Sequence, residues 1–263
     1  LLTAEMKAWF EKNKDRFNLG LSFDGDMAMQ NANRSSSFNN VDLDFFVKTW
    51  PNQSVKMTIS PDTISNMAEG VMFLHRKGFK YISADLAMGN SIEWTKEKLV
   101  IYKTELKKLV EFYLANPQLI PFSMLRVDVN SIMHINAATH KTCSCGEDMV
   151  CVDWTGKAYA CHLFSPVTIS MEKAAKAAKT IDFKDHLCFN NGKCAKCILN
   201  TVCTHCYGMN YVCSDDINTP SPFHCSAFKL QFVANCRYQL QIAKRNGEDD
   251  AILRINKLIN KIV

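Results

Sequence analysis

Short apolar runs alternate with longer stretches of helical periodicity through the first half of the sequence. The apolar runs predict buried strands at 19–25, 55–60 and 79–86. Apolar residues recur every three or four positions, as in amphipathic helices, at 3–15, 41–49 and 95–115. A further helix is expected to begin at Ser60-Pro61-Asp62, with Ser60 as its N-cap, and to end near Gly78. The polar segment 26–40 predicts a loop.

Strands that alternate with amphipathic helices favour parallel βαβ units, so the predicted fold class is α/β. Only three such strands are visible, which is too few to close a barrel, and they would leave an unpaired edge. We therefore expect the second half of a larger α/β barrel. The sequence opens with Leu1 inside a helical pattern, and we expect the remaining strands upstream of it.

The alternation stops near residue 118. Residues 122–136 are expected to hold a strand and a loop, and a loop-rich region follows from Cys143 to about 225. Within that region, 153–161 predicts a β-hairpin with Gly156 in its turn. Apolar faces predict helices at 226–245 and 249–262.

Composition and charge exclude several classes of protein. The sequence is 47% hydrophobic and 22% charged, which is typical of a soluble globular protein. Its net charge of +5 is mild and spread along the chain, so no nucleic-acid partner is expected. No apolar stretch approaches the ~20 residues of a membrane span, and no signal peptide is expected. These features favour a cytoplasmic protein without a membrane partner.

Cysteine is the residue type whose distribution departs most from an ordinary chain. All twelve cysteines fall after residue 142, whereas a disulfide-stabilised secreted protein of this size would carry them throughout. Four of them form the array C-x2-C-x5-C-x2-C at Cys194, Cys197, Cys203 and Cys206. Clustered thiols in a chain of this kind indicate metal binding.

Four further cysteines bring the number of candidate ligands to eight, enough for two four-thiolate sites: Cys145, Cys151, Cys161 and Cys225. Structural zinc uses paired C-x2-C knuckles, which the array contains, so a zinc ribbon is one interpretation. The longer and uneven spacings of Cys145, Cys151 and Cys161 favour larger, interleaved iron–sulfur clusters.

The order of these eight cysteines, with four residues between Gly156 and the third, Cys161, resembles the SPASM domain. That domain is the auxiliary-cluster extension of radical S-adenosylmethionine (radical SAM) enzymes that modify peptides. The family's array ends in C-x3-C, whereas Cys203 and Cys206 are separated by two residues. In the first half, Ser22-Phe-Asp-Gly25 and Asn31-Ala-Asn-Arg34 resemble the fourth strand of the radical SAM barrel and the loop after it.

The resemblance implies a partial radical SAM (β/α) barrel at 1–120, a SPASM domain at 121–240 and a C-terminal helix at 241–263. It implies two auxiliary 4Fe-4S clusters, one held by Cys145, Cys151, Cys161 and Cys206, and the other by Cys194, Cys197, Cys203 and Cys225. Four cysteines have no place in that scheme: Cys143, Cys188, Cys213 and Cys236. Cys143 competes with Cys145 for its place.

The resemblance also implies roles for three other residues. Ser22 and Asp24 lie where the family approaches S-adenosylmethionine; a buried strand end with an Asp-Gly turn is the structural alternative. His162 follows Cys161, where sulfatase-maturing relatives carry an aspartate that is the proposed proton acceptor, and the alternative is a surface histidine. Trp154 and the run from Tyr207 to Tyr211 are expected to pack around a cluster.

One motif of radical SAM enzymes is missing. They bind the cluster that cleaves S-adenosylmethionine through C-x3-C-x2-C, and no cysteine precedes Cys143. We therefore expect either a fragment or a degenerate relative. The third cluster and S-adenosylmethionine would belong to the intact enzyme, with a peptide or protein substrate and a reductant such as flavodoxin or ferredoxin. The alternative from another class is a non-catalytic zinc- or iron–sulfur-binding module.

Overall fold

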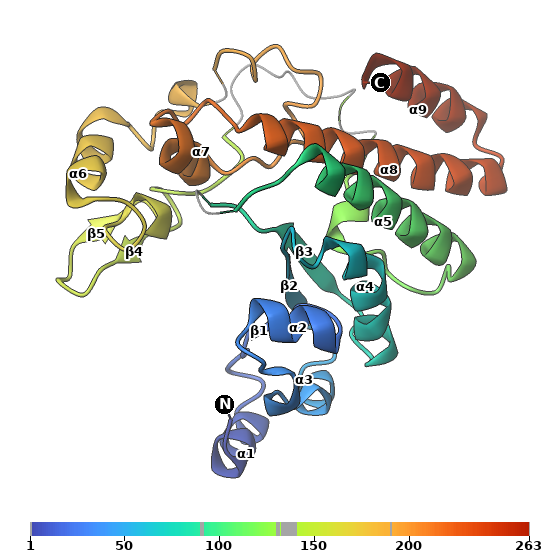
Figure 1. Cartoon of the computed structure of the whole chain (residues 1–263), viewed down its shortest axis with the longest axis horizontal. Coiled ribbons are helices and arrows are strands. Elements are labelled where there is room, and N and C mark those ends of the chain that lie inside the picture. The colour runs from blue at the N-terminus through green and yellow to red at the C-terminus, as the bar shows by residue number, and fades with distance from the viewer. Residues whose placement is uncertain (1, 90–91, 130–131, 133–140, 190, 263) are drawn as a thin grey trace. The chain divides into compact units, whose positions relative to one another are not determined.

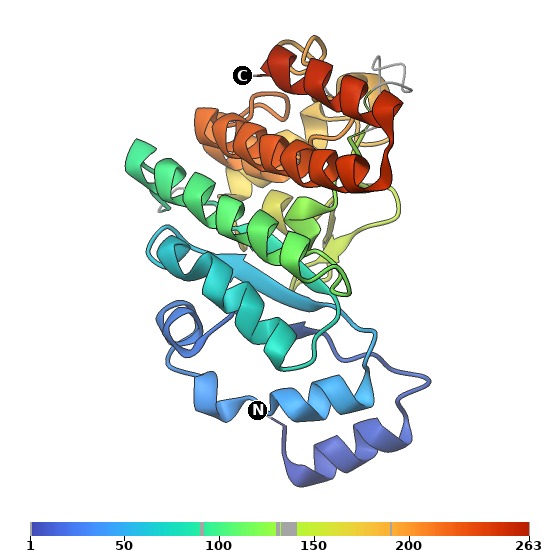
Figure 2. The same ribbon diagram turned by 90° about the vertical axis from the view of Figure 1, so that its right-hand side faces the viewer.

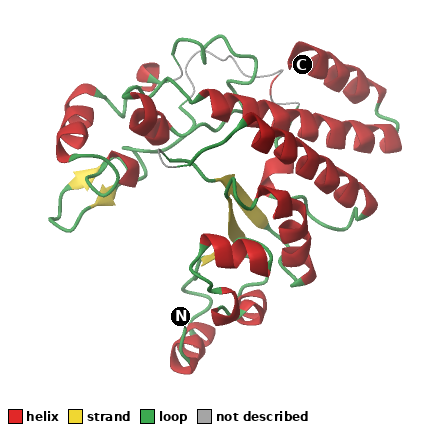
Figure 3. Ribbon diagram, viewed as in Figure 1, coloured by secondary structure: helices red, strands yellow, loops and turns green. Residues whose placement is uncertain are grey.

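The computed structural model describes residues 2–89, 92–129, 132, 141–189 and 191–262. The chain divides into two compact units. The first comprises Leu1–Ala87, Ile92–Val129 and Lys229–Val263, and the second comprises Met88–Ser91 and Asn130–Phe228. Strands are few in both units, and most of the second unit is loop (Figure 3).

The first unit is built on a parallel three-stranded sheet, as the sequence predicts. Its strands are β1 (Leu21–Ser22), β2 (Val55–Ile59) and β3 (Ile82–Leu86), in the order β1-β2-β3 (Figure 1). Val55 is the partner of Leu21 on one side and of Ile82 on the other. The prediction of an α/β fold with parallel strands is therefore confirmed, although β1 is shorter than its apolar run.

Six α-helices belong wholly to this unit in the part of the chain that the structure describes. They are α1 (Ala4–Lys12), α2 (Met27–Asn33), α3 (Leu43–Thr49), α4 (Met67–Arg76), α5 (Lys96–Ala115) and α9 (Asp249–Ile262). The 25-residue helix α8 (Pro222–Asn246) begins in the second unit and ends in the first. The helices α4 and α5 pack against each other, as the view in Figure 2 shows.

Apolar side chains of the strands and helices form the core of the first unit. Alternate residues of β2, namely Val55, Met57 and Ile59, are fully buried. Apolar residues of α4 are also buried, with Val71 and Leu74 at 0% exposure. These positions explain why the periodic pattern identified β2 and α4 correctly.

Two predictions for the segments beside the sheet are wrong. Residues 26–40 contain the helix α2, because the Asp26 side chain caps it by accepting from the Met29 N–H at 2.9 Å. Ser60 does not cap a helix: a 3-10 turn (Ile64–Asn66) comes first and α4 begins at Met67. The Ser60 hydroxyl instead donates to Asn33 Oδ1 at 2.9 Å.

The segment after α5 supports β3 with a side chain. Residues 122–129, which the structure describes, hold a 3-10 turn (Ser123–Leu125) and no strand, so the strand expected there is wrong for that part. Residues 130–131 and 133–136 of the same expectation lie outside the described residues. Ser123 Oγ accepts from the Ala84 N–H at 2.8 Å and donates to the Ala84 carbonyl at 3.3 Å, so it binds β3 where a further strand would pair.

The second unit contains the predicted hairpin and two helices that were not expected. The hairpin pairs β4 (Cys151–Val152) with β5 (Ala158–Tyr159) antiparallel, and Gly156 has a φ of 84° in its turn. The unexpected helices are α6 (Met171–Thr180) and α7 (Tyr207–Ser214). Short 3-10 turns cover His162–Phe164 and His186–Cys188.

No helix within the described part of the chain combines the length and the apolar character that crossing a membrane requires.

Candidate metal centre

The cysteines offer thiol chemistry for metal binding. All twelve lie in the part that the structure describes, and none of them forms a disulfide there. Their exposure differs widely, from the buried Cys145, Cys161 and Cys236 to the exposed Cys197 and Cys225. Free thiols beside one another, not a disulfide framework, are therefore the chemistry that this unit offers.

One set of neighbouring thiols contains Cys145, Cys161, Cys206 and Cys143. Burial raises the pKa of the Cys145 thiol to about 12, and the charges of Cys143 and Cys161 add to the increase, while Lys141 opposes it. Burial also raises the pKa of Cys161, to which the charges of Cys206 and Cys143 contribute. Cys145 and Cys161 thus lie within electrostatic range of one another and of Cys143, and Cys161 also lies within that range of Cys206.

Backbone contacts explain how Cys145 and Cys206 come to lie beside Cys161. The Gly146 N–H donates to the Ala160 carbonyl at 3.0 Å, which ties the residue after Cys145 to the residue before Cys161. The helix α7 begins after Cys206, whose sulfur accepts from the Met209 N–H at 3.5 Å.

A glycine allows α7 to approach the loop that carries Cys161. A Cβ added at Gly208 would lie 2.6 Å from Leu163 Cβ, closer than real side chains pack. Any larger residue at this position would push Cys206 and the 162–164 turn apart. Gly208 therefore contributes to the thiol site by its lack of a side chain.

A second set of neighbouring thiols contains Cys194, Cys197, Cys203 and Cys225. Burial raises the pKa of Cys194, and the charges of Cys225 and Cys197 add to the shift. Burial raises the pKa of Cys203 to about 12; the His205 N–H opposes this, and the charges of Cys225, Cys194 and Cys197 add to it. Cys225, on α8, thus joins three thiols that lie far earlier in the chain.

Short turns bring the first three members of this second set together. The Cys197 N–H donates to the Cys194 carbonyl at 3.0 Å, and the Cys203 N–H donates to the Leu199 carbonyl at 2.8 Å. Cys206 follows Cys203 by three residues but contributes to the other set. The two sets are therefore interleaved in sequence.

The structure places Cys151 differently from the other proposed ligands. It lies in β4, opposite Tyr159 of β5. Among the described residues, no three His, Cys, Asp or Glu side chains converge closely enough to hold a metal ion as they stand. Ligation by the eight cysteines therefore stays a prediction, one that requires the thiol side chains to turn toward a common point.

Two histidines lie beside the second set of thiols, and no motif in the sequence distinguishes them from the other histidines. His224 Nε2 is 3.7 Å from Cys203 Sγ, and the His224 ring stacks on Phe228. Burial lowers the pKa of His224 to about 4, with a contribution from His205. His205 is itself buried, and its Nε2 has no hydrogen-bond partner. Both rings are therefore neutral near pH 7.

Of the other residues that the sequence indicates near the thiols, some lie where they are expected and others do not. His162 is exposed, and its carbonyl accepts from the hydroxyls of Ser165 and Thr168. Tyr207 and Tyr211 are buried beside Cys145 and Cys161, as expected. Trp154 is 76% exposed, so the expectation that it packs around a cluster is wrong.

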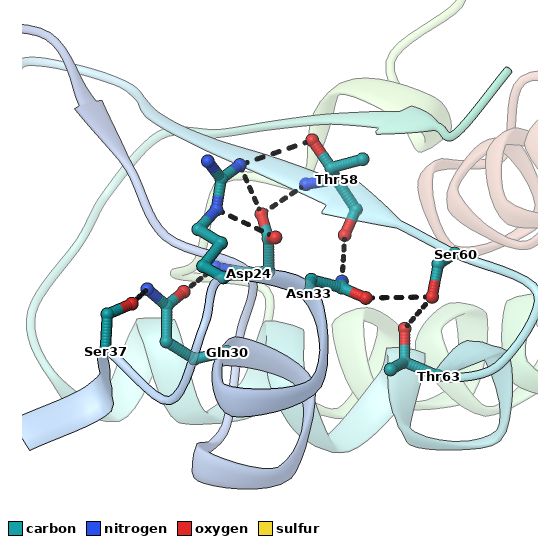
Figure 4. Close-up of polar contacts among 8 residues, drawn as sticks. Asp24, Gln30, Asn33, Ser37, Thr58, Ser60 and Thr63 are labelled. Atoms are coloured by element: carbon teal, nitrogen blue, oxygen red, sulfur yellow. Dashed lines mark hydrogen bonds and ion pairs between the residues drawn. The ribbon is translucent and has the colours of Figure 1, made fainter. Parts of the chain in front are cut away.

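The predicted S-adenosylmethionine residues lie in the first unit, at the carboxyl end of the sheet. Ser22 is exposed at the end of β1, whereas Asp24 is 1% exposed. Arg34 donates from Nε to Asp24 Oδ2 at 2.8 Å and from Nη2 to Oδ1 at 2.9 Å. The Thr58 N–H donates to the same Oδ1 at 2.7 Å (Figure 4). The Asp24 carboxylate is thus engaged by the protein itself.

Amide and hydroxyl groups extend this network on both sides of Asp24 (Figure 4). Gln30 Oε1 accepts from the Asp24 N–H at 2.8 Å, and its Nε2 donates to Ser37 Oγ at 2.9 Å. Asn33 Nδ2 donates to the Thr58 carbonyl at 3.1 Å. The carboxyl ends of parallel strands are where α/β folds usually bind ligands, so this polar network is the candidate ligand site of the first unit.

Comparison with the models of known protein families finds no match to this chain, and no curated protein matches it. The functional assignment therefore depends on the chemistry of these two sites and on the motifs that the sequence carries.

Proposed function

We propose that this chain is part of a radical SAM enzyme with a SPASM domain, which modifies a peptide or protein by hydrogen abstraction through a 5′-deoxyadenosyl radical. One observation carries the proposal: the division of the thiols into two interleaved sets. Cys206 lies with Cys161, and Cys225 lies with Cys194 and Cys203. This is the order in which a SPASM domain distributes its ligands, and consecutive zinc knuckles would divide the same residues differently.

The cysteine side chains of the second unit are donors of the kind that 4Fe-4S clusters require. Thiolates are the ligands that 4Fe-4S clusters take from proteins, four for each cluster. When bound, such clusters transfer single electrons or anchor a substrate. The first set supplies Cys145, Cys161 and Cys206, with Cys151 as the fourth ligand in the family's scheme. The second set supplies its four thiols, and the neutral His224 lies in contact with one of them.

In the first unit, Asp24 is proposed to position Arg34 rather than to contact the ligand. Both oxygens of its carboxylate already accept hydrogen bonds from the chain. A guanidinium held in this way is rigid, and its planar donors suit a carboxylate such as that of S-adenosylmethionine. Ser22, exposed at the same end of the sheet, offers a hydroxyl to the same ligand.

His162 is the proposed proton acceptor after hydrogen abstraction. Its exposed ring follows Cys161 directly, so it adjoins the first thiol set while remaining accessible to a substrate. A positioned base contributes typically 10²–10⁴-fold to a rate. In the intact enzyme, His162→Ala is expected to retain both clusters and to form 5′-deoxyadenosine, while peptide modification falls by about that factor.

The cluster that starts the reaction is not encoded in these residues. The sequence has no C-x3-C-x2-C motif, because its first cysteine is Cys143. The intact enzyme would carry that third cluster with S-adenosylmethionine and would take electrons from a flavodoxin or ferredoxin. The 263-residue chain by itself is therefore expected to release no 5′-deoxyadenosine when it is reduced.

A second candidate function is a non-catalytic zinc module. The tight turn between Cys194 and Cys197 has the C-x2-C spacing of a zinc knuckle, and Cys197 is exposed as in many surface zinc sites. Such a module would need no radical chemistry, and its partner would be another macromolecule.

Metal analysis after anaerobic reconstitution tests the proposal. Two clusters predict about eight iron and eight sulfide per chain and a brown protein. About two zinc ions, without charge-transfer absorbance and without sulfide, would contradict the proposed function and support the zinc module.

A further inference from the structure

The first thiol set contains a cysteine for which the family's scheme has no place. Cys143 is partly buried and packs against the core cluster that includes Cys145, Cys161 and Tyr207. With Cys151, five cysteines are therefore candidates for the four ligand positions of the first cluster site. The surroundings of Cys143 and Cys151 indicate which of the two is the fourth ligand.

The chain on the N-terminal side of Cys143 is anchored to the residue that follows Cys206. The Thr142 N–H donates to the Tyr207 hydroxyl at 3.0 Å, and Thr142 Oγ1 approaches the same hydroxyl at 3.2 Å. Tyr207 is only 1% exposed, so this anchor lies within the core. Cys143 and Cys206 are thus each one residue away from the same hydrogen-bonded pair.

A buried lysine, also on the N-terminal side of Cys143, ties this segment to the residues that follow Cys143. The side chain of Lys141 is 1% exposed, and its Nζ donates to the Cys145 carbonyl at 2.7 Å and to Glu147 at 2.6 Å. The same group also donates to the Phe183 carbonyl. Cys143 therefore lies between Thr142, which is bound to Tyr207 in the first turn of α7, and Cys145, whose carbonyl is bound by Lys141.

The electrostatic surroundings agree with this placement. After burial, the charge of Cys143 is the largest influence on the pKa of the Cys145 thiol. Cys143 likewise acts on Cys161. Two of the three other thiols of the site therefore have Cys143 as a close neighbour.

Cys151 has different surroundings. It is paired with Tyr159 in the hairpin, and its neighbour Val152 is paired with Ala158. This two-residue ladder fixes its backbone, whereas Cys143 lies in a bend outside regular structure. Cys143 packs against the core cluster that holds Cys145 and Cys161, whereas Cys151 is not among the described, partly buried residues that pack against it.

We infer that Cys143, rather than Cys151, is the fourth thiolate of the first cluster site, with Cys145, Cys161 and Cys206. The inference rests on the proposed function. Ligation here is an exchange of protons for iron: each thiol loses its proton as its sulfur binds, and no sulfur is oxidised.

Alkylation of the reconstituted chain gives the most direct test, because it requires no substitution. Iodoacetamide modifies free thiols and spares those bound to iron, and mass spectrometry of peptides reports each cysteine separately. We expect Cys143 to be protected at least tenfold relative to the same residue in the iron-free chain. Cys151 should be alkylated equally in both forms, as should the exposed Cys213, which serves as the control.

Three variants complete the test: Cys143→Ala, Cys151→Ala and the matched control Cys213→Ala. Cys143→Ala should lose about half of the bound iron and sulfide, and the other two should retain all of it. Loss of iron in Cys151→Ala with full retention in Cys143→Ala would overturn the inference, as would protection of Cys151 alone. A wild-type chain that binds no iron and sulfide would instead contradict the proposed function, so the two failures are distinguishable.

Discussion

The buried carboxylate of Asp24 shows how one residue can organise a site. It accepts three hydrogen bonds from Arg34 and Thr58, and these join the turn after β1 to the end of α2 and to β2. Hydrogen bonds to charged groups contribute about 1.5–3 kcal/mol each to stability, and leaving a buried partner unsatisfied costs as much. The geometry of the polar site therefore depends on this one charge.

Asp24→Asn is expected to lower the free energy of unfolding by about 1.5–3 kcal/mol, because the amide replaces one acceptor oxygen by a donor that faces Arg34. Urea denaturation of the chain measures the change. The control is Asp62→Asn, since Asp62 is exposed and its substitution should stay within about 0.5 kcal/mol of wild type. Equal stability of both variants would show that the Asp24 network is not stabilising.

His75 gives the stability of the first unit a pH dependence. Its Nδ1 is 3.0 Å from the Phe79 carbonyl and its Nε2 is 2.9 Å from the Tyr113 hydroxyl. The carbonyl can only accept, so Nδ1 carries the proton of the neutral ring. The Tyr113 hydroxyl accepts from the Phe122 N–H, which leaves its own proton for His75 Nε2. Protonation of His75 would place a second donor opposite this hydroxyl.

Burial lowers the pKa of His75 below its ordinary value of 6.5. The unfolded chain therefore binds this proton at a higher pH than the folded chain does, and stability is lost as pH falls below about 6.5. Urea denaturation of wild type and His75→Gln between pH 7.5 and pH 5 should show a smaller decline in the variant. His205 and His224, whose pKa values are also lowered, are present in both proteins and cancel in the comparison. Parallel declines would contradict the role of His75.

At the scale of elements, the turn after β1 packs directly on α4 because both carry glycine. Gly25 has a φ of 100°, and a Cβ added to it would lie 2.8 Å from Gly70 Cα. The buried sulfur of Met29 fills the space beside them. This contact fixes the position of Asp24 relative to α4.

Gly25→Ala is expected to destabilise the chain by about 1–3 kcal/mol from backbone strain alone, and the clash with Gly70 adds to that cost. Thermal or urea unfolding measures it. Gly20→Ala is the control, because a Cβ there meets no atom within 4 Å and the residue lacks a positive φ. If Gly25→Ala were as stable as Gly20→Ala, the close contact between the turn and α4 would be refuted.

Periodicity identified the elements whose apolar faces are buried, and it failed where polar residues form the helix. The strand β2 and the helices α4 and α5 follow their predicted stripes, because core burial selects the residues at those positions. The helix α2 was missed since its stability depends on the Asp26 cap and on the buried Met29 rather than on a full apolar face. The helix α6 was missed for a similar reason, as alanines form its buried side.

The contacts of the candidate sites were harder to predict than their residues. The SFDG motif pointed to Asp24, but its pairing with Thr58 joins residues 34 positions apart. The spacing of the cysteines identified eight candidate ligands, whereas the proximity of Cys143 depends on the anchors that Lys141 and Tyr207 provide. Such long-range contacts have no signature in local sequence.

At the scale of the whole molecule, the chain combines two units that differ in their secondary structure and in the size of their apolar cores. The first has a parallel sheet and a conventional apolar core, while the second has a two-stranded hairpin, short helices and free thiols around a smaller core. Small units with little regular structure commonly gain stability from bound metal. The central claim is therefore that the eight thiolates form two interleaved metal sites rather than two consecutive ones.

Iron content of two double variants tests this claim most directly, with iron and sulfide measured after anaerobic reconstitution and cluster type assigned by Mössbauer spectroscopy. If the sites interleave, Cys206→Ala with Cys161→Ala disables one site only, and about four iron per chain should remain. Cys206→Ala with Cys203→Ala should disable both sites and leave no cluster. The opposite pattern, with a four-iron cluster retained only by the Cys203 and Cys206 variant, would show that the C-x2-C-x5-C-x2-C array is a single site and would contradict the account.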